Sequence, residues 1–172
     1  GGGFIGLEMA ENLKSRGLDV TLLQRSGQVM PPLDADMASI VHNYIRAKGI
    51  DLLLRASVTG ISASEGSLDV RLAESDPVSA ELVILAVGVV PENHLAKEAG
   101  LALGMKGAIR TNSHMQTDDP DIYAVGDAVE VIHFVSGEHA VISLAGPANK
   151  QGRVAADHIC GVPRHFKGSQ GS

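Results

Sequence analysis

Helical and strand-like spacings of apolar residues alternate along the first part of the chain. Leu7, Ala10 and Leu13 follow helical spacing within residues 6–16, and Gly17 predicts the end of that helix. Residues 20–23 form a short apolar run, which predicts a buried strand. A helix followed by a short aliphatic strand is typical of α/β proteins, in which helices connect parallel strands.

The following segment repeats this alternation. Asp34 is a good N-cap for a second helix, which Gly49 ends. One face of that helix is apolar and consists of Met37, Ile40, Val41, Tyr44 and Ile45. The aliphatic runs at residues 50–54 and 82–87 predict buried parallel strands. Alternation at residues 67–72 instead predicts an exposed antiparallel strand.

The second half of the chain has shorter predicted elements. A helix is expected at residues 95–99, and strands at residues 109–111 and 121–125. A longer helix is predicted at residues 147–159, with Pro147 in its first position and Gly161 as its stop. His133 and His139 flank a predicted hairpin turn, and the Gly/Ser-rich residues 167–172 are interpreted as a linker.

Composition indicates a folded, aliphatic protein. The 172 residues are 44% hydrophobic but only 3% aromatic, and the net charge is −6. An acidic surface disfavours nucleic acid and anionic membranes as partners, and no apolar run approaches the roughly 20 residues of a membrane span. The single Cys160 cannot form an internal disulfide, which favours a cytoplasmic location. We expect Cys160 to be a small buried apolar residue, and the seven histidines to lie at the surface without metal-ligand spacing.

The chain begins with a glycine motif. Gly1, Gly3 and Gly6 have the G-x-G-x-x-G spacing that holds a dinucleotide pyrophosphate at a helix N-terminus. Such a loop normally follows a buried strand, and no residue precedes it here. We therefore expect an internal part of a longer enzyme, in which residues 20–23 and 82–87 have unpaired strand edges. The alternative is a glycine-rich arm without a ligand.

The end of the first predicted strand bears on nucleotide choice. The position that usually carries an acid for the adenosine ribose hydroxyls is Gln24, and Arg25 follows it. Glutamine has no charge to repel a 2′-phosphate, and arginine attracts one. The pair therefore favours tolerance of NADPH as well as NADH, unless Arg25 simply points to solvent.

A second motif lies at residues 117–127, where an apolar strand leads to Gly126 and Asp127. With this motif the chain resembles the FAD-dependent pyridine nucleotide-disulfide oxidoreductases. Residues 28–34, 95–104 and 147–153 are similar to the branch that contains coenzyme A-disulfide reductases, NADH oxidases and persulfide reductases. The resemblance implies an α/β fold: a Rossmann-like NAD(P)-binding lobe (residues 1–90) with a parallel sheet and an antiparallel meander, then the C-terminal half of an FAD-binding lobe (residues 91–172).

The resemblance also implies site residues. Asp127, after Gly126, would bind the ribityl chain of FAD, and the helix beginning near Pro147 and Ala148 would point its N-terminus at the flavin. Glu8 would lie near the nicotinamide and the flavin. The remaining positions implied for NAD(P) are the glycine loop with Phe4 and Ile5, Gln24 and Arg25, and Ala86 and Gly88. Two purely structural alternatives stay open: Asp127 as a turn or N-cap residue, and Glu8 as an ordinary acid in the first helical turn.

The implied function is that of a flavoprotein oxidoreductase. Hydride would pass from NAD(P)H to FAD, and the electrons on to a small disulfide or persulfide, such as one linked to coenzyme A. The redox cysteine and the dimerisation domain of that family have no counterpart in these residues, so the chain alone is expected to be inactive and the full-length enzyme to be a homodimer. The alternative is a non-catalytic NAD(P)-binding or redox-sensing module, which would need the first motif but not the second.

Overall fold

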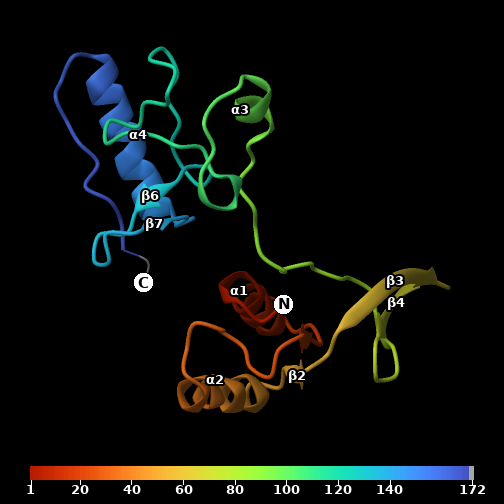
Figure 1. Ribbon diagram of the computed structural model, residues 1–172. Coiled ribbons are helices and arrows are strands. Elements are labelled where there is room, and N and C mark those ends of the chain that lie inside the picture. Colours follow the sequence, from red (N-terminus) through yellow and green to blue (C-terminus); the bar gives the residue numbers. More distant parts are fainter. Residues whose placement is uncertain (171–172) are drawn as a thin grey trace. The chain divides into compact units, whose positions relative to one another are not determined.

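The computed structural model describes residues 1–170. The chain divides into two compact units, Gly1–Gly88 and Val89–Ser172 (Figure 1). The assignment of these units to NAD(P) and FAD stays a prediction.

The N-terminal unit begins with two helix–strand pairs. Helix α1 (Phe4–Ser15) precedes strand β1 (Thr21–Gln24), and helix α2 (Ala35–Ala47) precedes strand β2 (Asp51–Leu54). The two strands are parallel, with Leu22 opposite Leu52. These elements confirm the α/β pattern expected from the apolar spacing, with bounds shifted by one to two residues.

A small aliphatic core joins these elements. Its buried members are Ala10, Leu22, Val29, Ile45, Ile50 and Leu52. Helix α2 buries Ala38, His42 and Ile45, of which Ile45 belongs to this core. Of the apolar face expected for this helix, Met37, Ile40 and Tyr44 are instead exposed, because the two-stranded sheet covers only a narrow stripe of the helix.

An antiparallel meander follows. Strands β3 (Val58–Ser64), β4 (Ser67–Leu72) and β5 (Val78–Ala80) form a three-stranded sheet in that order. The expected antiparallel strand at residues 67–72 is confirmed as β4. A parallel pair and a meander in one unit agree with the expected fold class.

The aliphatic run at residues 82–87 differs from expectation. It forms no strand in the part of the chain that the structure describes. Leu82, Leu85 and Val87 are 64%, 70% and 80% exposed. The prediction of a buried strand was therefore wrong here, because an apolar run becomes a strand only beside a partner that accepts its hydrogen bonds. The finding agrees with the expected unpaired edges.

The C-terminal unit contains more loop than strand. Its elements are helix α3 (His94–Glu98), a 3₁₀ turn (Met105–Gly107), strands β6 (Val131–Ile132) and β7 (His139–Ala140), and helix α4 (Ala145–Ile159). The β6–β7 hairpin turns at Gly137, which has φ +74°, as the sequence predicted. The strands expected at residues 109–111 and 121–125 are reduced to single bridges, such as Gln116 with Tyr123.

Helix α4 corrects two expectations. It begins at Ala145, so Pro147 is its third residue and not its first; proline is still tolerated there because the first helical N–H groups have no partner within the helix. Cys160 is exposed and not buried, since it caps the C-terminus of α4.

The C-terminal segment, interpreted above as a linker, is hydrogen-bonded to the β6–β7 hairpin at Ser169. Phe134 donates its N–H to Ser169 O at 2.8 Å, and Ser169 donates to Ile132 O at 3.0 Å. Residues up to 170 therefore pack onto the β6 hairpin. Residues 171–172 of the expected linker lie outside the described residues.

Candidate functional site

The glycine loop is shaped by two close approaches and one open position. A Cβ on Gly1 would overlap the carbonyl oxygen of Ala86, and a Cβ on Gly6 would overlap that of Gly1. A Cβ on Gly3 would meet no heavy atom within 4 Å. Gly1 and Gly6 therefore allow the loop, the helix and residues 82–87 to pack closely, while Gly3 leaves space above the loop. These are the separate tasks expected of the three glycines of a dinucleotide loop.

The loop ends at the N-terminus of α1. Gly3 is the N-cap, and no side chain among the described residues caps this helix. The first N–H groups, on Phe4, Ile5 and Gly6, have no acceptor within the helix, so they and the helix dipole favour an anion. An open glycine in front of an uncapped helix fits a pyrophosphate.

Gln24 is tied to the loop. Its Oε1 accepts a hydrogen bond from Gly2 N at 2.8 Å, and its Nε2 donates to Ser26 Oγ at 2.6 Å and to Gln28 O at 3.1 Å. The predicted ribose acceptor thus positions the loop, and only the remaining lone pair of Oε1 is left for a hydroxyl group.

The loop is supported from the other side by a buried histidine. Met30 donates its N–H to Gly2 O at 2.8 Å, and the adjacent Val29 donates to His42 Nε2 at 3.1 Å. Burial, with a contribution from the Arg46 charge, lowers the pKa of His42 below its ordinary value. The surface placement expected for all seven histidines is therefore wrong for His42, whose neutral ring serves as an acceptor.

The other predicted NAD(P) residues lie around this loop. Ala86 contacts Gly1, and Gly88 has φ +105°, a backbone conformation that other residues rarely adopt. Arg25 is exposed. Glu8 is exposed and is the fifth residue of α1, beyond the first turn. The alternative interpretation of Glu8 as a first-turn acid is therefore wrong, and its role near a nicotinamide stays a prediction.

In the C-terminal unit, Asp127 lies in the turn that follows Gly126. Gly126 N donates to Gln151 Oε1 at 2.7 Å, and Gln151 is only 1% exposed. Helix α4 thereby fixes the turn, while the Asp127 side chain stays exposed. This geometry is compatible with a ligand carboxylate and with a turn residue.

A recess of about 460 Å³ lies at the N-terminal end of α4. Phe134 and Phe166 line it together with Gly146, Pro147 and Lys150. No side chain in residues 1–170 caps this helix either. Aromatic walls, a lysine and free helical N–H groups suit a flat, partly anionic ring system. Ala148 is the fourth residue of the helix, in the turn that borders this recess.

Comparison with known proteins decides the family. The family model for pyridine nucleotide-disulphide oxidoreductases matches residues 1–152. The chain belongs to this family. The family uses FAD and NAD(P)H as cofactors.

Similar proteins are longer than this pyridine nucleotide-disulphide oxidoreductase chain. It is 44% identical to an NADH oxidase of Methanocaldococcus jannaschii over 96% of the chain and 37% of the relative. It is 36% identical to an NAD(P)H coenzyme A polysulfide/persulfide reductase of Pyrococcus horikoshii, over 100% of the chain and 38% of the relative. The crystal structure of reduced Bacillus anthracis CoADR-RHD matches with a TM-score of 0.90 and 46% identity, covering 98% of this chain and 30% of that one. The chain thus spans well under half of each.

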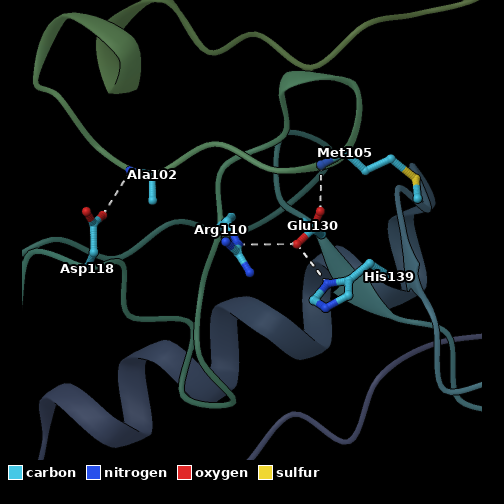
Figure 2. Close-up of polar contacts among 6 residues, drawn as sticks. All are labelled: Ala102, Met105, Arg110, Asp118, Glu130 and His139. Atoms are coloured by element: carbon cyan, nitrogen blue, oxygen red, sulfur yellow. Dashed lines mark hydrogen bonds and ion pairs between the residues drawn. The ribbon is translucent and has the colours of Figure 1, made fainter.

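Sequence reasoning missed a buried carboxylate in this oxidoreductase chain. Glu130 is 8% exposed; its Oε2 accepts from Met105 N at 2.6 Å, and its Oε1 lies 2.8 Å from His139 Nδ1 and 3.7 Å from Arg110 Nε (Figure 2). A Cβ on Gly104 would overlap this carboxylate. Glu130 therefore fastens the 3₁₀ turn to the β6–β7 hairpin, and nothing in the local sequence pattern marks it.

A histidine cluster was also missed. The rings of His114 and His158 stack with centroids 4.2 Å apart, and His165 lies 4.3 Å from His114. Tyr123 Oη is 2.7 Å from His158 Nδ1. The three histidines are far apart in sequence, so their spacing gives no signal. Among residues 1–170, no group of three or more metal-binding side chains is arranged to hold an ion.

No helix in the described part of the chain is both long and apolar enough to cross a bilayer.

Proposed function

We propose that this chain carries the nicotinamide nucleotide site and part of the flavin site of an NAD(P)H-dependent oxidoreductase that reduces small disulfides or persulfides. The observation that carries the proposal is the glycine loop, in which two glycines permit close packing and the third leaves its Cβ position open at a free helix N-terminus. Membership of the family and the sulfur-reducing relative support the choice of reaction.

The N-terminal unit would hold the nucleotide. The N–H groups of Phe4 and Ile5 donate to the pyrophosphate, and Gly3 lets it approach. Gln24 accepts from a ribose hydroxyl while it keeps its bond to Gly2. Ala86 and Gly88 border the nicotinamide side, because Ala86 already contacts the loop.

The C-terminal unit would hold part of the flavin. Asp127 accepts from ribityl hydroxyls, in a turn that Gln151 fixes. The N-terminus of α4 stabilises negative charge at the edge of the ring system by about 0.3–1 kcal/mol, or more where water is excluded. When bound, FAD supplies the two-electron chemistry that links a nicotinamide to a disulfide.

The terminal acceptor, the location and the assembly belong to the same proposal. We place the protein in the cytoplasm and expect a homodimer at full length, with no nucleic-acid partner. The similarity to a persulfide reductase supports a sulfur acceptor. The similar NADH oxidase makes oxygen the acceptor to be tested against it.

The experiment uses the purified full-length protein. The proposal predicts a yellow protein whose visible flavin absorption bleaches on anaerobic addition of NAD(P)H and returns on addition of coenzyme A disulfide or persulfide. A protein that stays colourless after incubation with FAD would refute the flavoenzyme assignment. If oxygen restores the colour and neither sulfur compound does, oxygen is the acceptor and the sulfur assignment is wrong.

A further inference from the structure

Two arginines lie at neighbouring strand ends beside the glycine loop. The β1–β2 register pairs Gln24 with Leu54, so Arg25 and Arg55 are the next residues on the two strands. Arg55 N donates to Ser26 O at 3.0 Å, and Ala56 N donates to Gln24 O at 3.0 Å. The two backbones therefore stay side by side beyond the last paired residues.

The Arg55 side chain turns back over the loop that follows β1. Its Nε and Nη2 lie 3.6 and 3.7 Å from where a Cβ on Gly27 would be. Arg55 also has φ +56°, which is uncommon for a residue other than glycine. Its guanidinium is thus held over the loop that carries Arg25.

This pair of positive charges has no acidic partner. No ion pair within residues 1–170 includes Arg25 or Arg55. The position that would usually supply a carboxylate here is the neutral Gln24, whose amide is fixed by Gly2 and Ser26. Two arginines thus follow adjacent strand ends at the edge where α/β proteins bind ligands, and arginine forms charge-assisted hydrogen bonds with phosphate.

We propose that Arg25 and Arg55 together bind the 2′-phosphate of NADPH and make this protein prefer NADPH over NADH. Arg55 is a specificity-determining residue that supplies the second cation from the neighbouring strand. A phosphate monoester carries close to two negative charges, and arginine binds its oxygens in bidentate fashion. The inference rests on the proposed nucleotide site and adds the identity of its nucleotide.

The same chemistry occurs in coenzyme A, whose adenosine carries a 3′-phosphate. The glycine loop and the ribose position of Gln24 favour the dinucleotide as its source. The test therefore compares adenosine 2′,5′-bisphosphate, adenosine 3′,5′-bisphosphate and 5′-AMP as ligands of the full-length protein, measured by calorimetry. A separate assay measures KM for NADPH and NADH in flavin reduction.

The variants are Arg55→Ala, Arg25→Ala and Gln24→Glu, with Arg16→Ala as the matched control, because Arg16 is an exposed arginine at the far end of α1. Wild type should bind the 2′,5′-bisphosphate at least about tenfold more tightly than 5′-AMP, as expected for charge-assisted bonds. Arg55→Ala should remove most of that difference and raise KM for NADPH, with KM for NADH and kcat unchanged. Gln24→Glu should lower the 2′-phosphate preference by charge repulsion, and Arg16→Ala should match wild type.

The NADPH preference and the proposed oxidoreductase reaction can be refuted separately. Equal wild-type binding of the 2′,5′-bisphosphate and 5′-AMP, or tighter binding of the 3′,5′-bisphosphate, would overturn the NADPH assignment. An Arg55→Ala variant that keeps the 2′-phosphate preference would overturn the role of Arg55. Intact 2′-phosphate preference without any flavin reduction would support this inference and refute the proposed reaction.

Discussion

Adding a side chain at Gly3 should weaken nucleotide binding at least about tenfold without unfolding the protein. Gly3 has φ −81° and ψ −173°, an extended conformation open to any residue. A Cβ there has no neighbour within 4 Å. Alanine is a poorer N-cap than glycine by less than about 1 kcal/mol. Its lower entropy in the unfolded chain offsets this by about 0.4–1 kcal/mol. The free energy of unfolding should therefore change little.

The effect on binding should be much larger. The added carbon occupies the space through which a pyrophosphate reaches the N–H groups of Phe4 and Ile5. Each hydrogen bond to a charged group contributes about 1.5–3 kcal/mol. The loss of one such bond raises Kd for the nucleotide at least about tenfold. Gly3→Val should raise Kd more than Gly3→Ala does, because the valine side chain extends further from the loop.

The assay pairs thermal melting with calorimetric titration of NADP⁺ into the full-length protein, because the oxidised nucleotide binds without reducing the flavin. Glu11→Ala is the control, since Glu11 is exposed on α1 away from the loop. Both Gly3 variants should melt at the wild-type temperature. Their affinity for the nucleotide should fall from wild type to Gly3→Ala and further to Gly3→Val. A Gly3→Val protein with wild-type melting and wild-type affinity would refute the assignment of this loop to the nucleotide.

Three further predictions concern His42, Glu130 and Asp127. Because burial lowers the folded-state pKa of His42, the unfolded chain binds more protons below about pH 6.5, and the free energy of unfolding should fall as pH drops. His42→Gln keeps an acceptor for Val29 and should flatten that dependence in urea melts, whereas an unchanged slope would contradict it. Glu130→Ala leaves Met105 N without its acceptor and should cost about 1–3 kcal/mol of unfolding free energy; an unaltered urea midpoint would be inconsistent with this account. Asp127→Ala should lower the flavin content of the purified protein but not the melting temperature of its flavin-free form, and full flavin occupancy would leave Asp127 a turn residue only.

Local pattern was sufficient where the hydrogen-bond partners of an element lie within it or in the adjacent segments, as for α1 and for β4 between β3 and β5. Helix α1 and the meander strand β4 were predicted because amphipathic spacing, stops and alternation are properties of neighbouring residues. Residues 82–87 have an equally strong aliphatic pattern, but a strand depends on a partner elsewhere in the chain. Strand expectations therefore failed where pairing is absent or reduced to single bridges.

The site also combines features that depend on neighbouring residues with features that depend on distant parts of the chain. The spacing of the glycine motif predicted which glycines pack closely and which one stays open, but not that Ala86 is the residue packed against Gly1. Residues that act across the fold were missed: Gln151 holds the Gly126 turn from 25 positions away, and Arg55 joins the loop after β1 from the neighbouring strand. Cys160 was placed wrongly because it follows the last residue of α4 as its C-cap, where it is exposed.

The most direct test of the central claim is an experimental structure of the full-length protein crystallised with NADP⁺. The account predicts the pyrophosphate above Gly3, within hydrogen-bond distance of the N–H groups of Phe4 and Ile5, and the 2′-phosphate between Arg25 and Arg55. A dinucleotide bound elsewhere, with this loop unchanged and facing only solvent, would contradict it.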